Sequence, residues 1–175
     1  MAIHEEETQT SGGERGAGLP EIEIRSLKTG EDTTAFRTLN EEWISRYFTL
    51  EKMDRETLGD PENKILRKGG HIFMVYLGHQ AVGCVALIPL GQGVYELSKM
   101  AVSPELRGLG IGRRLLQHTI KQAKLIGAKS LFLGSNAKLT NAVHLYESVG
   151  FRHVAPEKIP PMPYTRANVF MEMPL

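Results

Sequence analysis

The stretch from Arg107 to Gly112, Arg-Gly-Leu-Gly-Ile-Gly, combines residue types that can bind phosphate. Glycines let the backbone approach an anion closely, and the free amides and dipole of a helix N-terminus favour negative charge. The stretch follows a strand-like run that ends at Val102 and precedes a helical pattern, and Arg113 and Arg114 add positive charge. The sequence therefore predicts an anion-binding turn between a strand and a helix, the alternative being a tight connection that binds no ligand.

Two common phosphate-binding motifs do not fit this turn. A Walker loop requires Gly-Lys-Ser/Thr, whereas Arg113 and Arg114 follow the glycines here. The dinucleotide fingerprint requires a glycine three residues after its second glycine, and position 113 is arginine. That fingerprint also follows a strand that opens a parallel unit, whereas an antiparallel meander is expected before this turn.

A known family does fit. Residues 102–116, Val-Ser-Pro-Glu-Leu-Arg-Gly-Leu-Gly-Ile-Gly-Arg-Arg-Leu-Leu, resemble the acetyl-CoA motif of the GNAT superfamily of N-acetyltransferases, Arg/Gln-x-x-Gly-x-Gly/Ala after a valine-rich strand. Residues 145–151, Leu-Tyr-Glu-Ser-Val-Gly-Phe, resemble its second motif, Leu-Tyr-x-x-x-Gly-Phe. The resemblance covers residues 22–175. It implies an acyltransferase that moves the acetyl group of acetyl-CoA to a primary amine of a small molecule, amino acid or peptide, without a metal.

The resemblance implies a cofactor site built mainly from backbone amides. In this family the cofactor lies where two central strands splay apart, so Met100, Ala101 and Val102 are expected to line the pantetheine arm. Many relatives have an asparagine where this chain has Leu139, and Asn136 is the expected substitute, unless it caps a helix. The pyrophosphate is expected to meet the amides of the turn: Arg107, Gly108, Leu109, Gly110, Ile111, Gly112 and Arg113.

The resemblance also implies direct attack of the amine on the thioester. An alkylammonium has a pKa of about 10, so a base must accept its proton, directly or through water. Glu96 lies where several relatives have a catalytic glutamate, the alternative being a strand residue facing solvent. Tyr146 occupies the family's tyrosine position and would contact the cofactor and protonate the thiolate, the alternative being a core tyrosine. A backbone amide within residues 100–102 would stabilise the oxyanion. A non-catalytic module that binds acetyl-CoA is the alternative function.

The acceptor side is expected to involve the first helices and the C-terminal loop. Tyr47 and Phe48 are candidates to line the pocket, or to belong to the core with Trp43. Arg166 ends the proline-rich segment 159–166 and is a candidate to hold a substrate carboxylate. Acidic residues nearby would attract a cationic amine or form a solvated helix face: Glu41, Glu42, Glu51 and Asp54.

Hydrophobic periodicity predicts the elements that position these residues. Short glycine-containing turns join the later strands of the first half into an antiparallel meander. A strand, a helix and a strand in succession then imply a right-handed parallel crossover. The expected fold is an α/β domain with one mixed sheet, antiparallel first and partly parallel later, and the resemblance adds splayed central strands. The expected strands are 21–25, 71–77, 81–88, 94–102, 130–133 and 167–173, and the expected helices are 33–47, 60–69, 111–126 and 139–149.

The composition limits the classes of binding partner and the cellular compartment that we expect for this protein. The 175 residues carry a formal net charge of +1, which gives no reason to expect nucleic acid or a membrane as a partner. One cysteine, Cys84, excludes an internal disulfide and a cysteine-based zinc site. Residues 1–20 are acidic, rich in glycine, serine and threonine, and unlike a signal peptide, so a disordered tail before a domain at 21–175 and a cytoplasmic protein are expected. The assembly state is open, a homodimer being one alternative.

Overall fold

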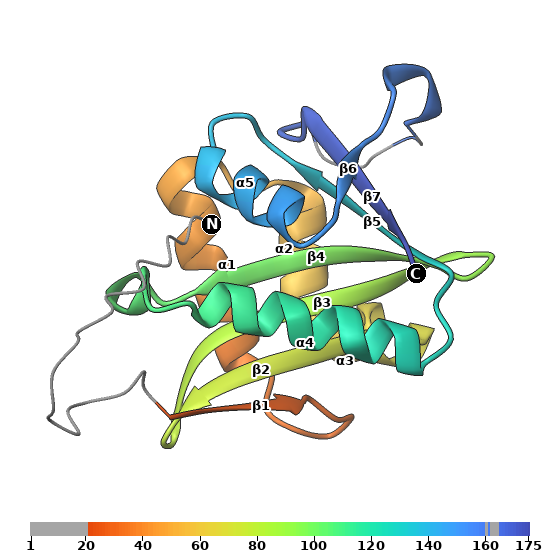
Figure 1. Ribbon diagram of the computed structural model, residues 1–175. Helices are drawn as coiled ribbons and strands as arrows, with labels where there is room; N and C mark the ends of the chain where they lie inside the picture. Colours follow the sequence, from red (N-terminus) through yellow and green to blue (C-terminus); the bar gives the residue numbers. More distant parts are fainter. Residues whose placement is uncertain (1–20, 160, 162–164) are drawn as a thin grey trace, which may run out of the picture.

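The computed structural model describes residues 21–159, 161 and 165–175 and contains one seven-stranded mixed sheet with helices on both faces (Figure 1). The strand order across the sheet is β1-β2-β3-β4-β5-β7-β6. The strands are β1 Ile22–Ser26, β2 His71–Leu77, β3 Gln80–Gly91, β4 Val94–Val102, β5 Ser130–Ser135, β6 Arg152–His153 and β7 Val169–Pro174.

The helices form a layer on each side of the sheet. Helices α4 and α5 pack with one buried cluster, and α1, α2 and the residues that follow them pack with the other. Figure 1 shows α4 crossing the central strands on the face opposite α1. The helices are α1 Thr34–Tyr47, α2 Lys52–Gly59, α3 Pro61–Lys64, α4 Ile111–Leu125 and α5 Thr140–Ser148, with short 3-10 turns at Leu66–Lys68, Pro104–Leu106 and Pro156–Lys158.

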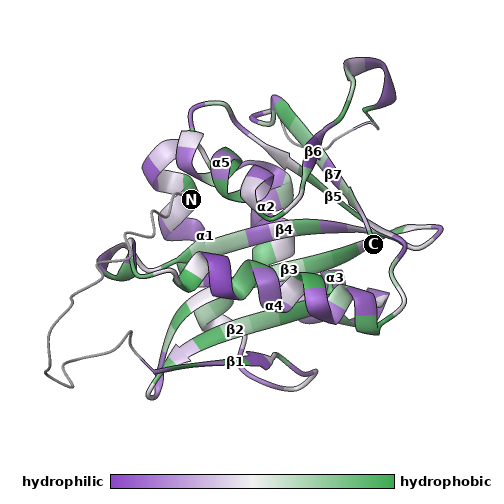
Figure 2. Ribbon diagram, in the orientation of Figure 1, coloured by the Kyte–Doolittle hydropathy of each residue, from purple (hydrophilic) through white to green (hydrophobic). Residues whose placement is uncertain are grey.

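The central strands are apolar because both of their faces are covered. Strands of a sheet with helices on both sides read as nearly continuous hydrophobic runs, and β2 and β3 contain such runs. Figure 2 shows hydrophobic residues concentrated in these strands. Along α4 it shows hydrophobic and hydrophilic residues in alternation. The buried side of α4 consists of Ile111, Gly112, Leu115, Leu116, Thr119 and Ala123. The apolar stripe predicted for this helix is therefore the face that packs on the sheet.

Strand β4 is irregular at its centre. It pairs with β3 in antiparallel register, with Ala86 opposite Ser98 and Cys84 opposite Ala101. One residue of β3 therefore faces both Lys99 and Met100, which is a β-bulge. Lys99 adopts a left-handed backbone conformation, with φ of 54°, that a non-glycine residue seldom takes.

Strands β4 and β5 diverge after a short parallel pairing. The paired residues run from Val94 to Glu96 in β4, opposite Ser130 to Phe132 in β5. Strand β5 continues to Ser135 and pairs with β7 along its whole length. The second half of β4 thus has no strand beside it on this side. We call the opening between β4 after Glu96 and the end of β5 the wedge.

The structure confirms the predicted fold class, with the antiparallel meander, the parallel crossover and the splayed central strands. Four boundary predictions are wrong: the helix expected at 60–69 is α3 followed by a 3-10 turn, the strands expected to end at 88 and 133 continue to Gly91 and Ser135, and the last strand begins at Val169. Helix α2 and strand β6 were not expected. Helix α2 buries only Asp54, Thr57 and Leu58, which is too little for an apolar stripe. The tail predicted at 1–20 lies outside the described residues.

Candidate active site

The glycine-rich turn leads into the N-terminus of α4. Gly108 and Gly110 have φ of 81° and 74°, in the left-handed region where a side chain would strain the backbone. Gly110 is the N-cap of α4, so its conformation directs the chain into the helix. Among the described residues, no side chain caps this end, and its first turn holds no acidic residue. The first amides of a fifteen-residue helix are therefore available to an anion.

Arginines on either side of the turn are tied to neighbouring helices. Arg107 Nη1 donates to the Tyr47 hydroxyl of α1 at 3.0 Å, and Arg113 Nη2 donates to Ser148 Oγ of α5 at 3.0 Å. Tyr47 was predicted to line the acceptor pocket. The structure places it, 40% exposed, beside Arg107 of the glycine-rich turn instead, while its neighbour Phe48 does line the pocket.

A single pocket passes through the wedge and joins the two helical layers. Its walls come from β4, from the end of β5, from α1 on one face and from α5 on the other. Helices from opposite faces can share one pocket only because the sheet is open between β4 and β5. The lining residues are Asn40, Trp43, Ile44, Phe48, Glu96, Leu97, Ser98, Lys99, Met100, Gly134, Ser135, Asn136, Leu139, Tyr146, Arg166 and Ala167.

The backbone of β4 in the wedge suits an extended, amide-containing ligand. Buried backbone groups need hydrogen-bond partners, and an exposed strand edge accepts an extended chain as an added strand. Met100 lines the pocket, and Val102 lines a smaller groove that also contains Arg107. Ala101 is buried against the α1 side of the sheet. Residues 100–102 thus form a path from the pocket to the glycine-rich turn.

Glu96 lies in the wall of the pocket. It is the last β4 residue paired with β5, opposite Phe132, and it is half-buried and lines the pocket. Burial raises the pKa of the Glu96 carboxyl, and the nearby charge of Lys99 opposes that rise. A carboxylate with a raised pKa is a stronger base than an exposed one, as general-base catalysis near neutral pH requires.

Tyr146 reaches the same pocket from α5. Its side chain is 8% exposed and packs edge-on against Phe151 with ring centroids 5.9 Å apart. Burial raises the pKa of its phenol to about 12, so the hydroxyl keeps its proton at neutral pH. The tyrosine belongs to the core and also lines the pocket, so its place in the core is confirmed, whereas its contact with the cofactor and its role as an acid stay predictions.

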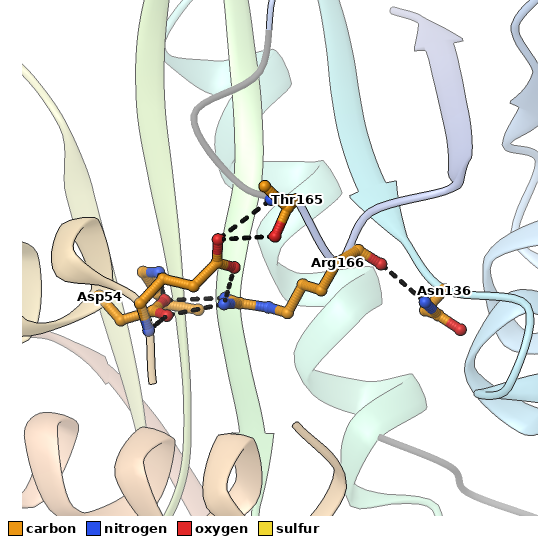
Figure 3. Close-up of polar contacts among 6 residues, drawn as sticks. Asp54, Asn136, Thr165 and Arg166 are labelled. Carbon is orange, nitrogen blue, oxygen red and sulfur yellow. Dashed lines mark hydrogen bonds and ion pairs between the residues drawn. The ribbon is translucent and has the colours of Figure 1, made fainter. Parts of the chain in front are cut away.

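Asn136 uses its side chain within the protein. Its Nδ2 donates to the Arg166 carbonyl at 2.6 Å (Figure 3), and its Oδ1 accepts from the Lys138 amide at 2.9 Å. The N-cap of α5 is Leu139, so the helix-cap alternative for Asn136 is wrong. Its predicted contact with the pantetheine arm stays a prediction, and the side chain would have to share or exchange these bonds to make it.

Four charged residues form a group at the pocket, with two members buried and two partly buried, which we call the Asp54 cluster: Glu51, Asp54, Lys99 and Arg166. Lys99 Nζ lies 2.9 Å from Asp54 Oδ1. Arg166 Nη1 lies 2.6 Å from Asp54 Oδ2 and 2.9 Å from Glu51 Oε2, and its Nη2 donates to Asp54 Oδ1 at 2.8 Å. The Asp54 side chain is 0% exposed and that of Lys99 is 3% exposed. Figure 3 shows Arg166 extended toward Asp54, with its carbonyl facing Asn136.

Asp54 is ionised by its partners despite its burial. Burial alone would raise the pKa of this carboxyl, but hydrogen bonds from Arg166, Lys99 and the Glu51 amide, with the charge of Lys99, lower it to about 2. Asp54 reaches the Glu51 amide at 2.8 Å because the two residues form a capping box at the start of α2. The interpretation of these acids as a solvated helix face is therefore wrong for Asp54.

Arg166 was predicted to hold a substrate carboxylate. Both of its Nη atoms are bonded to Asp54 or Glu51, so a substrate carboxylate would have to share or displace these partners. Sequence reasoning named Asp54 only as one of four acids that could attract an amine, and it missed Lys99 and the buried ion pair between the two residues. The only signals were a Glu-x-x-Asp capping pattern at 51–54 and a lysine inside the otherwise apolar end of β4.

Nucleophilic and metal chemistry have little support among the described residues. Burial raises the pKa of the Cys84 thiol to about 12, so the thiolate is scarce at neutral pH. Within the described ranges, no group of three or more histidine, cysteine, aspartate or glutamate side chains is placed to hold a metal ion. No helix in this part of the chain is long and apolar enough to cross a membrane.

Comparison with known proteins identifies relatives of this arrangement. The family model described as "Acetyltransferase (GNAT) family" matches residues 35–151. An uncharacterised N-acetyltransferase of Schizosaccharomyces pombe is 32% identical over 147 residues, covering 81% of this chain and 90% of that protein.

Solved structures match the fold over nearly their whole length. A GNAT acetyltransferase of Staphylococcus aureus has a TM-score of 0.79 at 24% identity, covering 88% of this chain and 99% of that one. The PaiA N-acetyltransferase of Thermoplasma acidophilum, solved in complex with coenzyme A, has a TM-score of 0.68 at 20% identity, covering 89% and 99%.

Proposed function

This chain is a member of the GNAT acetyltransferase family, and we propose that it transfers the acetyl group of acetyl-CoA directly to a primary amine. The observation that carries the proposal is that Glu96 and Tyr146 line one pocket in the wedge. Met100 in its wall is two residues before Val102, which shares a smaller groove with Arg107 of the glycine-rich turn. A carboxylate with a raised pKa and a phenol that keeps its proton are the base and the acid that such a transfer needs.

The cofactor would extend from the turn into the pocket. The amides of residues 107–113 would bind its pyrophosphate, because the N-terminus of α4 and the arginines favour an anion there. The pantetheine arm would follow the backbone of residues 100–102, as an added strand follows an open edge. This path brings the thioester to the part of the pocket lined by Met100 and Glu96. A coenzyme A complex of the Thermoplasma structure supports this choice of cofactor.

The chemical step conserves every proton. The amine nitrogen attacks the thioester carbonyl carbon while Glu96, directly or through water, accepts the ammonium proton. A backbone amide of residues 100–102 donates to the resulting oxyanion. The tetrahedral intermediate then collapses, the carbon–sulfur bond breaks, and Tyr146 protonates the departing thiolate. The nitrogen of the product gives up its second proton to the Tyr146 phenolate, directly or through water, and Glu96 releases its proton to solvent. The products are the N-acetylated amine, coenzyme A and one proton.

A panel of primary amines tests the function. We expect release of free coenzyme A thiol from acetyl-CoA to depend on at least one amine, with formation of the acetylated amine seen by mass spectrometry. Coenzyme A should raise the thermal midpoint, since a ligand that binds only the folded state stabilises it. Binding without turnover on a wide panel would favour the alternative, a non-catalytic module of the same fold. No shift of the midpoint would contradict both functions.

The acceptor class can be tested at Arg166 with matched amines. Because the Nη atoms of Arg166 are bonded to Asp54 and Glu51, we expect Arg166→Gln to lower kcat/KM equally for an amino acid and for its amide. The ratio of the two kcat/KM values, measured with saturating acetyl-CoA, reports this directly. A loss at least tenfold larger for the amino acid, which is about 1.4 kcal/mol of selective binding, would instead support the predicted contact between Arg166 and a substrate carboxylate.

A further inference from the structure

The bulge at Lys99 places a strained residue at the pocket. Lys99 has φ of 54° and lies with Met100 opposite a single residue of β3. Both residues line the pocket where β4 has lost its neighbour β5. A residue in a rare conformation persists only when its surroundings hold it there, and such residues cluster at functional sites.

The Lys99 side chain is held by α2. Its ammonium is buried and lies 2.9 Å from the carboxylate of Asp54, whose side chain is fully buried. Asp54 is itself fixed by the Glu51 amide and by Arg166. The ion pair therefore ties the bulge to helix α2.

The backbone of Lys99 is held from β3. The Cys84 thiol donates to the Lys99 carbonyl with a sulfur–oxygen distance of 3.6 Å. Asn40 Nδ2 of α1 in turn donates to Cys84 Sγ at 3.3 Å and to the Phe36 carbonyl at 2.9 Å. The side chain and the carbonyl of one strained residue thus have separate supports, and neither support touches the glycine-rich turn.

We propose that Asp54 is a positioning residue for acetyl transfer: through Lys99 it fixes the β4 bulge that presents a backbone amide to the oxyanion, and it balances the ammonium beside Glu96. This proposal rests on the proposed function. It assigns Asp54 an effect on the chemical step and none on acetyl-CoA binding, because its contacts lie with α2, β4 and the segment before β7.

The charges around Glu96 make its pKa a measure of the positioning role of Asp54. Lys99, Arg166 and Tyr146 line the pocket with Glu96, Asp54 and Glu51 stand behind the two cations, and Cys84 contacts the Lys99 carbonyl from β3. Lys99 favours the ionised form of Glu96. Removing the ammonium should raise the pKa of Glu96, whereas removing the Asp54 charge should leave more positive charge nearby and lower it.

The test compares Asp54→Asn, Lys99→Met and the double variant Asp54→Asn/Lys99→Met with the wild type. The matched control is Glu56→Gln, which removes a carboxylate from the same helix, in an exposed pair 3.6 Å from Lys52. For each protein, kcat, KM for acetyl-CoA, the thermal shift with coenzyme A and the pH profile of kcat/KM are measured with one active amine.

We expect Asp54→Asn to lower kcat at least tenfold while KM for acetyl-CoA stays within threefold and the coenzyme A shift is kept. The acid limb of kcat/KM should move down by at least half a pH unit in Asp54→Asn and up by at least half a unit in Lys99→Met. The double variant carries no charge at either position, so its melting temperature should recover while its kcat stays low. Glu56→Gln should match the wild type.

Several results would overturn the proposal. A folded double variant with wild-type kcat would show that the bulge needs no ion pair. If the acid limb of the kcat/KM profile stays in place in Asp54→Asn and Lys99→Met, or moves in the same direction in both, Asp54 has no electrostatic effect on Glu96. Failure of the proposed function is seen separately, as a wild-type protein that acetylates no amine before any variant is compared.

Discussion

Replacement of Glu96 by glutamine will lower kcat/KM for the acceptor amine by about 10²- to 10⁴-fold, the range for loss of a general base. Glutamine keeps the shape of the side chain in the pocket wall but cannot accept the proton of the attacking ammonium. The pKa of Glu96 is raised by burial, so kcat/KM of the wild type should fall as the pH drops through a value above the ordinary 4.5 of a glutamate. The acid limb assigned to this carboxylate should vanish in the variant.

A matched control for this experiment lies in the same row of the sheet. Glu96 is opposite Phe132 of β5, which is opposite Glu172 of β7, and Glu172 is exposed. Glu172→Gln removes a carboxylate from the sheet without touching the pocket, and it should keep wild-type activity. A Glu96→Gln protein that binds coenzyme A normally and retains more than a tenth of wild-type kcat/KM would show that another group accepts the proton.

Replacement of Asp54 by alanine will lower the free energy of unfolding at pH 7 by about 3–5 kcal/mol, as expected when one partner of a buried ion pair is removed. The change takes the carboxylate from two cations, Lys99 and Arg166, that are largely out of solvent. Urea unfolding of wild type and variant measures the difference. Glu56→Ala, at an exposed pair on the same helix, should cost no more than about 1 kcal/mol.

The free energy of unfolding that is lost when Asp54 is replaced should depend on pH, and the pKa shift of Asp54 gives the direction of that dependence. The pKa of Asp54 is lowered to about 2 in the folded protein, from 3.8. Its ionisation therefore stabilises the fold above about pH 4, and that stabilisation, about 2 kcal/mol, is lost as the pH falls toward 2. The difference between wild type and Asp54→Ala should shrink over this interval. A difference that is constant from pH 7 to pH 2.5 would mean that packing, and not charge, accounts for the effect of Asp54.

Local patterns made the glycine-rich turn between strand and helix, and most of the elements, predictable. The turn depends on glycines with left-handed φ and on a helix start, and both features are determined by residues adjacent in the sequence. Strands β2 and β4 could be placed because their apolar runs end at glycine turns. Glu96 and Tyr146 were found through family motifs, and their convergence on one pocket follows from the crossover that the sequence predicts.

Long-range polar contacts could not be predicted in the same way. Asp54 and Lys99 are 45 residues apart, and Asp54 and Arg166 are 112 apart, so no local period links them. Asp54 on its own resembles an ordinary acid in a polar helix, and only its partners show that it is buried. Tyr47 and Phe48 were named together as candidates to line the pocket, but Tyr47 is the last residue of α1 and Phe48 is its extended C-cap. The chain changes direction between them, and the Tyr47 hydroxyl accepts from Arg107.

The wedge also gives the molecule a weakness that its outer strands do not share. Sheets usually offer an unpaired edge only at their margins, where short strands, charges and turns discourage pairing with other chains. Here an open edge lies in the middle of the sheet, along the second half of β4. An extended peptide that entered the wedge would pair with the same backbone that the pantetheine arm is proposed to use. Such a peptide would compete with the acetyl donor, whatever its side chains, and a saturating concentration of coenzyme A would keep it out.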